Sequence, residues 1–218
     1  MALLIDRFRG WLVGTPCVHE PDTPPRPCEG ARDVVLMIDV SVSMDAEDYE
    51  PSRLGAAKKA ALAFIEQLAQ EEPDAHVAVV AYGSDARTVC GLLSVRDLGP
   101  IRRAIEGLTT TSATNITAGL REALDLLPSR DAAVGQVIVL SDGHHNSGKK
   151  PHAIARELRQ RATIECVGIG GSPADVDEKL LRAVASSHPD GTKRYRWIGD
   201  GAQLVQHYRR LAGRIARS

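Results

Sequence analysis

Three separate segments of the sequence carry oxygen-bearing side chains at spacings that could hold a divalent metal ion. In the first, one carboxylate and two hydroxyls alternate two residues apart, at Asp39, Ser41 and Ser43. Residues at this spacing point the same way from an extended chain. Thr114 supplies a further hydroxyl, and Asp142 supplies a second carboxylate at the start of an Asp-Gly turn. This all-oxygen set suits Mg²⁺, Mn²⁺ or Ca²⁺ and disfavours zinc, which prefers nitrogen and sulfur ligands.

The segments that lead into these residues have the pattern of buried strands. Short apolar runs rich in β-branched residues predict strands at 34–40, 77–82, 88–93, 137–141, 164–169 and 195–198. Between them, apolar residues recur at the spacing of one-sided helices at 54–68, 98–108, 120–127, 153–161, 176–186 and 202–217. The alternation of strands and helices predicts a sheet covered by helices.

Continuously apolar strands must leave water on both faces, which is typical of parallel sheets. We therefore expect an α/β protein with a doubly wound, Rossmann-like three-layer sandwich, a mostly parallel central sheet and helices on both faces. The segment 88–93 follows its predecessor after a Gly-Ser-Asp turn. That turn is too short for a parallel crossover, so we expect one antiparallel edge strand there.

Ligands of open parallel sheets bind beyond the carboxyl ends of the strands. Asp39 ends the first predicted strand and Asp142 follows the fourth, so we expect three loops to bring the five candidate metal ligands to one crevice. Residues next to these ligands are expected to line its rim, where they could contact a partner: Asn115, Gly143, His144, His145 and Asn146.

With these residues in place, the sequence resembles a von Willebrand factor type A domain with a metal-ion-dependent adhesion site. The family pattern is Asp-x-Ser-x-Ser after the first strand, a threonine in a later loop, and an aspartate opening an Asp-Gly turn after the fourth strand. All of these positions are filled here, by Asp39, Ser41, Ser43, Thr114 and Asp142. The resemblance covers roughly residues 32–215.

The resemblance implies how such a site works. Serine and threonine hydroxyls would bind the ion directly, the aspartates would bind it directly or through water, and one coordination position would stay open. An ion held mostly by neutral hydroxyls keeps much of its charge, so a carboxylate from another molecule is an attractive final ligand. In similar domains, ligand binding can also be coupled to movement of the last helix.

The threonine loop departs from the common family pattern. It reads Thr111-Ser112-Ala113-Thr114 where relatives usually place glycines before the metal-binding threonine. Thr111 or Ser112 is therefore an alternative hydroxyl ligand to Thr114.

The leading functional hypothesis is a non-catalytic, metal-dependent protein-interaction module. Its partner would present an acidic side chain, and the resemblance implies a ring ATPase or a kinase-like signalling protein. One alternative is a metal-dependent phosphohydrolase with Asp39 as nucleophile, although such enzymes usually need a second carboxylate two residues on, where this chain has Ser41. A metal-free scaffold is the other alternative.

The composition argues against nucleic-acid and membrane partners. Lys and Arg together number 27 against 28 Asp and Glu, which gives a formal net charge of -1 and no global positive field. No uninterrupted apolar run approaches the roughly 18 residues needed to cross a bilayer. The apolar opening segment is interrupted by Asp6, Arg7 and Arg9 before a signal-peptide core forms. We therefore expect a cytoplasmic protein.

Residues 1–32 are interpreted as an N-terminal arm or linker, and residues 33–218 as the domain. The arm contains a proline-rich stretch without strand or helix periodicity. Cys17 and Cys28 bracket that stretch, and the sequence leaves open whether they pair, stay free or bind zinc with His19. Cys90 and Cys166 lie in strand-like apolar runs and are expected to be buried, reduced thiols.

Overall fold

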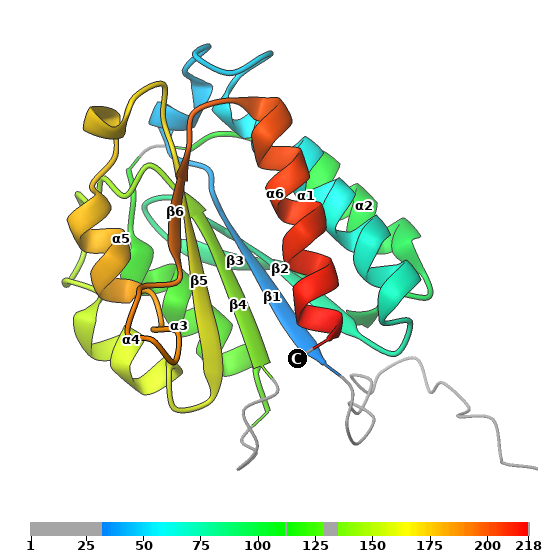
Figure 1. The fold of residues 1–218 in the computed structure, drawn as a ribbon. Helices are drawn as coiled ribbons and strands as arrows, with labels where there is room; N and C mark the ends of the chain where they lie inside the picture. The colour runs from blue at the N-terminus through cyan, green and yellow to red at the C-terminus, as the bar shows by residue number, and fades with distance from the viewer. Residues whose placement is uncertain (1–31, 112, 129–134, 218) are drawn as a thin grey trace, which may run out of the picture.

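A six-stranded sheet forms the middle layer of the computed structural model, which describes residues 32–111, 113–128 and 135–217. The strands lie in the order β3-β2-β1-β4-β5-β6 (Figure 1). Only β2 and β3 pair antiparallel; the other neighbours among the named strands are parallel. The strand bounds are β1 Asp33–Asp39, β2 His76–Tyr82, β3 Ala86–Ser94, β4 Gly135–Ser141, β5 Ala162–Ile169 and β6 Tyr195–Ile198.

Helices cover both faces of this sheet. One face carries α1, α2 and α6, and the other carries α3, α4 and α5 (Figure 1). Two short 3-10 helices, η1 and η2, lie at the carboxyl edge of the sheet. The helix bounds are η1 Val42–Asp45, α1 Arg53–Glu71, α2 Leu98–Glu106, α3 Ile116–Leu126, α4 His152–Leu158, η2 Pro173–Asp175, α5 Glu178–Val184 and α6 Gly201–Ala216.

The central strand β1 shows why the sheet needs two helical layers. All seven of its residues are buried. Val34, Leu36 and Ile38 pack into the core on the α1 side, whereas Val35 and Met37 pack into the core on the α3 side. Both faces of the strand therefore leave water, as alternation along a pleated strand requires.

The predicted α/β sandwich, its mostly parallel sheet and its antiparallel edge strand are confirmed. Some element bounds were wrong. The helix predicted at 120–127 begins earlier, at Ile116, because the Asn115 side chain accepts a hydrogen bond from the Ala118 N–H and caps the first turn. The helix predicted at 176–186 is shorter, at Glu178–Val184, and its start is fixed by Asp177, whose side chain accepts a hydrogen bond from the Leu180 N–H.

The predictions for the N-terminal arm, including Cys17, His19 and Cys28, fall on residues outside those described. Cys90 and Cys166 are buried free thiols, as expected. Within the described parts of the chain, no helix is both long and apolar enough to span a membrane.

Candidate metal centre

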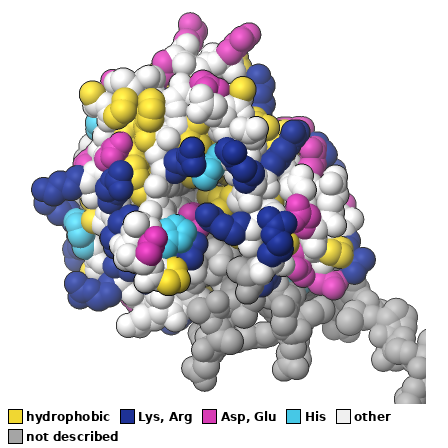
Figure 2. Space-filling view, in the orientation of Figure 1, with side chains coloured by type: hydrophobic (Ala, Val, Ile, Leu, Met, Phe, Trp, Pro, Cys, Tyr) yellow, Lys and Arg dark blue, Asp and Glu magenta, His cyan; other side chains and the backbone are white. Residues whose placement is uncertain are grey.

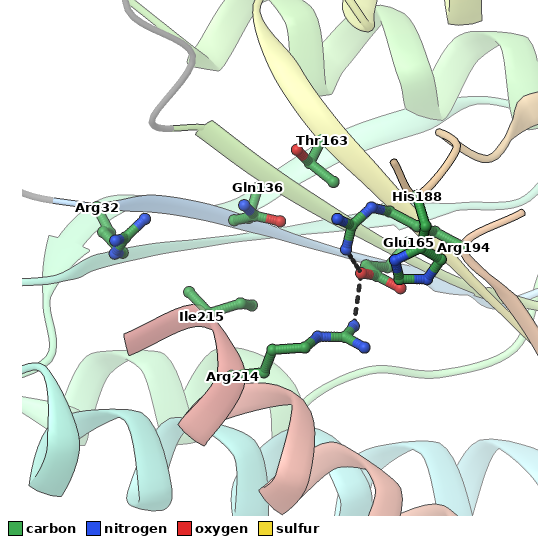
Figure 3. A pocket seen from close by; sticks show the side chains of 8 residues that line it. All are labelled: Arg32, Gln136, Thr163, Glu165, His188, Arg194, Arg214 and Ile215. Atoms are coloured by element: carbon green, nitrogen blue, oxygen red, sulfur yellow. Dashed lines mark hydrogen bonds and ion pairs between the residues drawn. The ribbon is translucent and has the colours of Figure 1, made fainter. Parts of the chain in front are cut away.

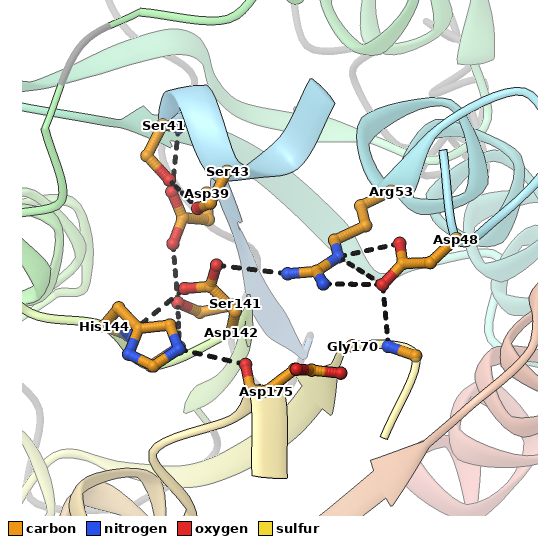
Figure 4. Close-up of polar contacts among 12 residues, drawn as sticks. Asp39, Ser41, Ser43, Asp48, Arg53, Ser141, Asp142, His144, Gly170 and Asp175 are labelled. Carbon is orange, nitrogen blue, oxygen red and sulfur yellow. Dashed lines mark hydrogen bonds and ion pairs between the residues drawn. The ribbon is translucent and has the colours of Figure 1, made fainter. Parts of the chain in front are cut away.

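The first candidate segment leaves the sheet at the carboxyl end of β1. Asp39 is fully buried, and its Oδ1 accepts a hydrogen bond from the Ser41 N–H at 2.9 Å. The hydroxyl oxygens of Ser41 and Ser43 lie 3.0 Å apart. Ser41 is buried, whereas Ser43 is exposed at the start of η1. The three predicted side chains therefore converge, with Ser43 on the solvent side (Figure 4).

Ser141 at the end of β4 joins the two acidic loops. Its hydroxyl donates to Asp39 Oδ2 at 2.6 Å and accepts a hydrogen bond from the Gly143 N–H at 2.9 Å. Sequence reasoning missed this residue. The signal was available, because Ser141 directly precedes the Asp-Gly turn on a strand that pairs with β1.

Asp142 is fully buried at the same edge. Its Oδ1 accepts a hydrogen bond from the His144 N–H at 3.2 Å, and its Oδ2 lies 3.4 Å from Arg53 Nη1. The turn after it requires glycine: Gly143 has φ of +80°, and a side chain there would meet the carbonyl oxygen of Asp177 at 3.0 Å. Gly143 thus shapes the turn that presents the Asp142 carboxylate.

The electrostatics of Asp39 are unfavourable in the absence of a cation. The pKa of this carboxyl is raised from 3.8 to about 6, mainly by burial and to a smaller extent by the negative charge of Asp142. Hydrogen bonds from Ser141 and Ser41 oppose part of this increase. Two buried carboxylates whose charges repel each other are therefore positioned where a cation would neutralise them.

Thr114 is buried and tied to the loop that follows Asp142. Its N–H donates to Asn146 Oδ1 at 2.9 Å, and its carbonyl oxygen accepts hydrogen bonds from the N–H groups of Asn146 at 3.1 Å and Ser147 at 3.2 Å. The threonine loop and the second acidic loop are thus held together by backbone contacts.

The alternative ligand Thr111 makes different contacts. Its hydroxyl donates to the Val40 carbonyl oxygen at 3.2 Å, and its N–H donates to the same oxygen at 2.5 Å. Thr111 is exposed, and on its inner side the hydroxyl lies against Gly83, where an added Cβ would be 2.0 Å from it. These contacts favour Thr114 as the ligand. Ser112, the other alternative, lies outside the described residues.

The five predicted rim residues differ in accessibility. His144 and Asn146 are exposed, and His144 Nε2 lies 3.0 Å from the Asp175 carbonyl oxygen. His145 is half-buried, and its Nδ1 accepts the Ile116 N–H at 3.2 Å. Gly143 is buried and Asn115 acts as a helix cap, so these two have structural roles.

Arg53 and Asp48 are polar residues of the site that sequence reasoning missed. The Arg53 side chain is 10% exposed; its Nε donates to Asp48 Oδ1 at 2.8 Å, and its Nη2 donates to Asp48 Oδ2 at 2.5 Å. This guanidinium lowers the pKa of Asp48, whose Oδ2 also accepts the Gly171 N–H at 2.7 Å. Arg53 thus bridges Asp48 and Asp142 (Figure 4). A sequence signal existed, since a cation in the first turn of a helix opposes the helix dipole.

Val42 lies between the two serines. Among the described residues it is a large apolar side chain that is exposed to solvent, at 59%. It directly precedes Ser43, which is also exposed. The solvent side of the candidate centre is therefore partly apolar.

The donor set fits a hard cation. It offers two carboxylates and three hydroxyls, from Asp39, Asp142, Ser41, Ser43 and Thr114. Among the described residues, no group of three or more His, Cys, Asp or Glu side chains could hold a metal ion, so a zinc-type site is not seen there. Nor does either nearby histidine hydrogen-bond to Asp39 within that part of the chain, as a base serving a nucleophile would.

Comparisons with known proteins match the family and the fold. The family model for the von Willebrand factor type A domain matches residues 34–145, just over half of the chain. A UPF0353 protein of Mycolicibacterium gilvum is 28% identical over 178 residues, covering 70% of this chain and 52% of that protein. One from Mycobacterium tuberculosis is 29% identical with the same coverage. The chain therefore spans about half the length of these curated relatives.

Solved structures have the same fold. A von Willebrand factor type A protein from Catenulispora acidiphila has a TM-score of 0.68 and 25% identity, covering 85% of this chain and 43% of that one. BatB from Bacteroides thetaiotaomicron has a TM-score of 0.68 and 19% identity, covering 86% of this chain and all of that one. At that lower identity the likeness concerns the fold alone. Together with the family match and the strand order, these similarities show that the chain belongs to the von Willebrand factor type A family.

Proposed function

We propose that this chain is a non-catalytic interaction module that binds Mg²⁺ or Mn²⁺ and, through the ion, an acidic side chain of a partner protein. Domains of this family often mediate protein interactions. The observation that carries the proposal is the convergence of two buried carboxylates, Asp39 and Asp142, with hydroxyl groups at one sheet edge.

Each candidate ligand would have a distinct task. The hydroxyls of Ser41, Ser43 and Thr114 would bind the ion as neutral ligands, while Asp39 and Asp142 supply negative charge directly or through water. Ser141 would orient the Asp39 carboxylate through its 2.6 Å hydrogen bond. Ca²⁺ is also compatible with this oxygen set.

The preference for an acidic partner follows from the charge of the centre. Three of the five donors are neutral, so the ion would keep part of its positive charge. Ser43 is exposed, which supports an open coordination position on the solvent side of the ion. A ring ATPase or kinase-like signalling protein in the cytoplasm is the class of partner we propose.

Metal binding is tested by isothermal titration of the full chain with Mn²⁺ and Mg²⁺. We expect one site per chain in the native protein and none in the Asp142→Ala variant. Asp190 is an exposed aspartate on another loop, so Asp190→Ala serves as the matched control and should bind as the native chain does. Absence of binding by the native chain would favour the metal-free scaffold.

Partner binding is tested by affinity capture with and without a chelator. A partner retained only with metal, and lost in Asp142→Ala, supports the proposal. The enzymatic alternative is addressed by incubation with phosphate esters and Mg²⁺. Turnover that disappears in Asp39→Asn would overturn the non-catalytic assignment.

A further inference from the structure

A polar pocket lies at the opposite end of the sheet from the candidate metal centre. Its volume is about 260 Å³, and it is enclosed by the amino ends of β1, β4 and β5, the segment before β6 and the last turn of α6 (Figure 3). The polar side chains that matter here are Arg32, Gln136, Thr163, Glu165, Arg194 and Arg214.

Strand alternation explains why these residues gather under α6. On this face of the sheet, the carboxyl halves of β4 and β5 present apolar residues such as Ile138 and Val167 to the helices. Two and four residues toward the amino ends, the same alternation presents Gln136, Glu165 and Thr163. The apolar core on this face thus gives way to a polar floor where α6 ends.

Glu165 organises two of the arginines. Its side chain is 9% exposed, and its Oε1 accepts hydrogen bonds from Arg194 Nη1 at 2.7 Å and from Arg214 Nη2 at 2.5 Å. Each guanidinium carries five N–H donors, so this shared oxygen occupies only a minority of them. The carboxylate therefore holds two cationic groups at one point and leaves most of their donors available.

The charge of the pocket is unbalanced. Three guanidiniums, from Arg32, Arg194 and Arg214, face one carboxylate, which gives a formal charge of +2 with His188 neutral. Within the described residues, Arg32 makes no ion pair. The carboxyl end of α6 adds only a partial negative charge of about half a unit. An anion would therefore be attracted to this pocket.

The positive region continues along α6 and β6. The pKa of His207 is lowered to about 4, mainly by burial and partly by the nearby positive charges of Arg196, Arg214 and Arg210. Figure 2 shows Lys and Arg side chains gathered on the face that carries α6 and β6. Since the whole chain has a net charge of only -1, this face is locally rather than globally positive.

We propose that this pocket binds a phosphate dianion, either free or as a monoester. A dianion would balance the formal charge of +2, whereas a single carboxylate would not. Planar guanidinium forks match phosphate oxygens, and the Gln136 amide and Thr163 hydroxyl offer further donors. The pocket is smaller than the roughly 300–1,000 Å³ of sites for drug-sized ligands, which suits a small anion.

The test is calorimetric titration of the full chain with inorganic phosphate in the presence of a chelator, so that no metal at the other end contributes. We expect saturable binding at millimolar phosphate. Arg214→Gln should weaken it at least about tenfold, as for the loss of a hydrogen bond to a charged group. Arg209→Gln, an exposed position on the same helix outside the pocket, should leave it unchanged.

Glu165→Gln separates ligand binding from a purely structural ion pair. Glutamine keeps an oxygen that can accept from both guanidiniums but removes the negative charge, so phosphate should bind more tightly and should raise the melting temperature of this variant more than that of the native chain. A structural ion pair alone would alter the melting temperature in both Glu165→Gln and Arg214→Gln without phosphate binding to either. The native chain failing to bind phosphate would overturn the proposal.

Two further ligands distinguish the source of the phosphate group. Tighter binding of inorganic phosphate would assign the pocket to the free ion, and tighter binding of phosphoserine would assign it to an ester. Acetate binding as tightly as either would contradict the proposal. Asp142→Ala should bind phosphate normally, so this result stands independently of the metal centre.

Discussion

Asp39 is destabilising in the metal-free protein because its carboxylate is buried. The folded state holds the proton more tightly than the unfolded state, with a pKa of about 6 against 3.8. The metal-free chain therefore loses stability as the pH rises from about 4 to about 6, and by pH 7 the loss amounts to about 3 kcal/mol at most. A bound cation would remove this penalty.

Asp39→Asn should therefore stabilise the chain in chelator while preventing metal binding. We expect the free energy of unfolding at pH 7 to rise by about 1–3 kcal/mol, since the amide keeps the shape without the charge. Urea denaturation in EDTA measures the change. Asp142→Asn is the control and should show no such gain, because it loses the Arg53 ion pair. A destabilised Asp39→Asn would contradict the assigned cause.

The same proton competes with metal. Below pH 6 the Asp39 carboxyl is protonated in the metal-free chain, so Mn²⁺ affinity should fall by about tenfold for each further pH unit. Calorimetry at pH 7.5 and at pH 5 compares the two regimes. Equal affinities at both values would show that Asp39 does not control binding.

Arg53 places a positive charge next to a candidate ligand. Replacing it in Arg53→Gln should raise Mn²⁺ affinity by about tenfold, because the cation no longer repels the ion across a buried site. The same change should lower the free energy of unfolding by about 1–3 kcal/mol, since Asp48 loses its partner. Calorimetry and urea denaturation measure the two effects. Arg53→Lys retains the charge and should bind metal as the native chain does.

At the scale of elements, the positions of the candidate ligands could be predicted because the two strands that lead to them are continuous apolar runs. β1 and β4 are continuous apolar runs that lie side by side, so Asp39 and Asp142 arrive at one edge of the sheet. The Thr114 backbone is joined to the second loop by two backbone hydrogen bonds and by one from the Asn146 side chain, and no local sequence pattern predicts these contacts. Arg53 reaches the site through tertiary packing, and its position in the first turn of α1 does not by itself identify Asp142 as its partner.

The fold class could likewise be predicted from the alternation of strands and helices and from the spacing of apolar residues. The short elements could not be predicted in this way. The single turn of η1 has too few residues to show a helical period, and the extent of α3 depends on one cap. Asn115 makes that cap and also donates to the Ser84 carbonyl oxygen at 3.2 Å. These two hydrogen bonds fix the position of Asn115, and therefore of the backbone next to Thr114.

Asn115→Ala should therefore affect both stability and metal binding. We expect the free energy of unfolding to fall by about 1 kcal/mol from the lost cap, and Mn²⁺ affinity to fall several-fold as Thr114 loosens. Asp97 caps α2 away from the centre, so Asp97→Ala should lower stability without changing metal affinity. Denaturation and calorimetry on both variants separate the two effects. Unchanged metal affinity in Asn115→Ala would show that the cap does not position the threonine.

At the scale of the whole molecule, the two ends of the sheet have opposite character. The carboxyl end collects buried acids, and the amino end collects arginines around Glu165. The helix α6 runs between them, from Gly201 near the end of β6 to Arg214 at the pocket (Figure 1). A near-neutral chain can therefore present one surface for a cation and another for an anion.

Charged side chains beside the candidate metal centre should influence the association rate of a partner protein. Lys149 and Lys150 are exposed in the loop after Asp142, and reversing both to glutamate should slow association of the captured partner several-fold at low salt. Surface plasmon resonance measures the rate. The adjacent lysines on α1, Lys58 and Lys59, provide a control pair for the same reversal. An unchanged association rate would reject electrostatic steering by this loop.

Val42 has a consequence for the choice of acidic sequence. A carboxylate that reached an ion beside Ser43 would bring its neighbouring residue over a valine that is 59% exposed. Covering that aliphatic side chain would release its hydration water, at about 25 cal/mol for each Å² removed from solvent. The candidate metal centre would then prefer a partner sequence in which an aspartate or glutamate is flanked by an apolar residue, rather than a run of acidic residues.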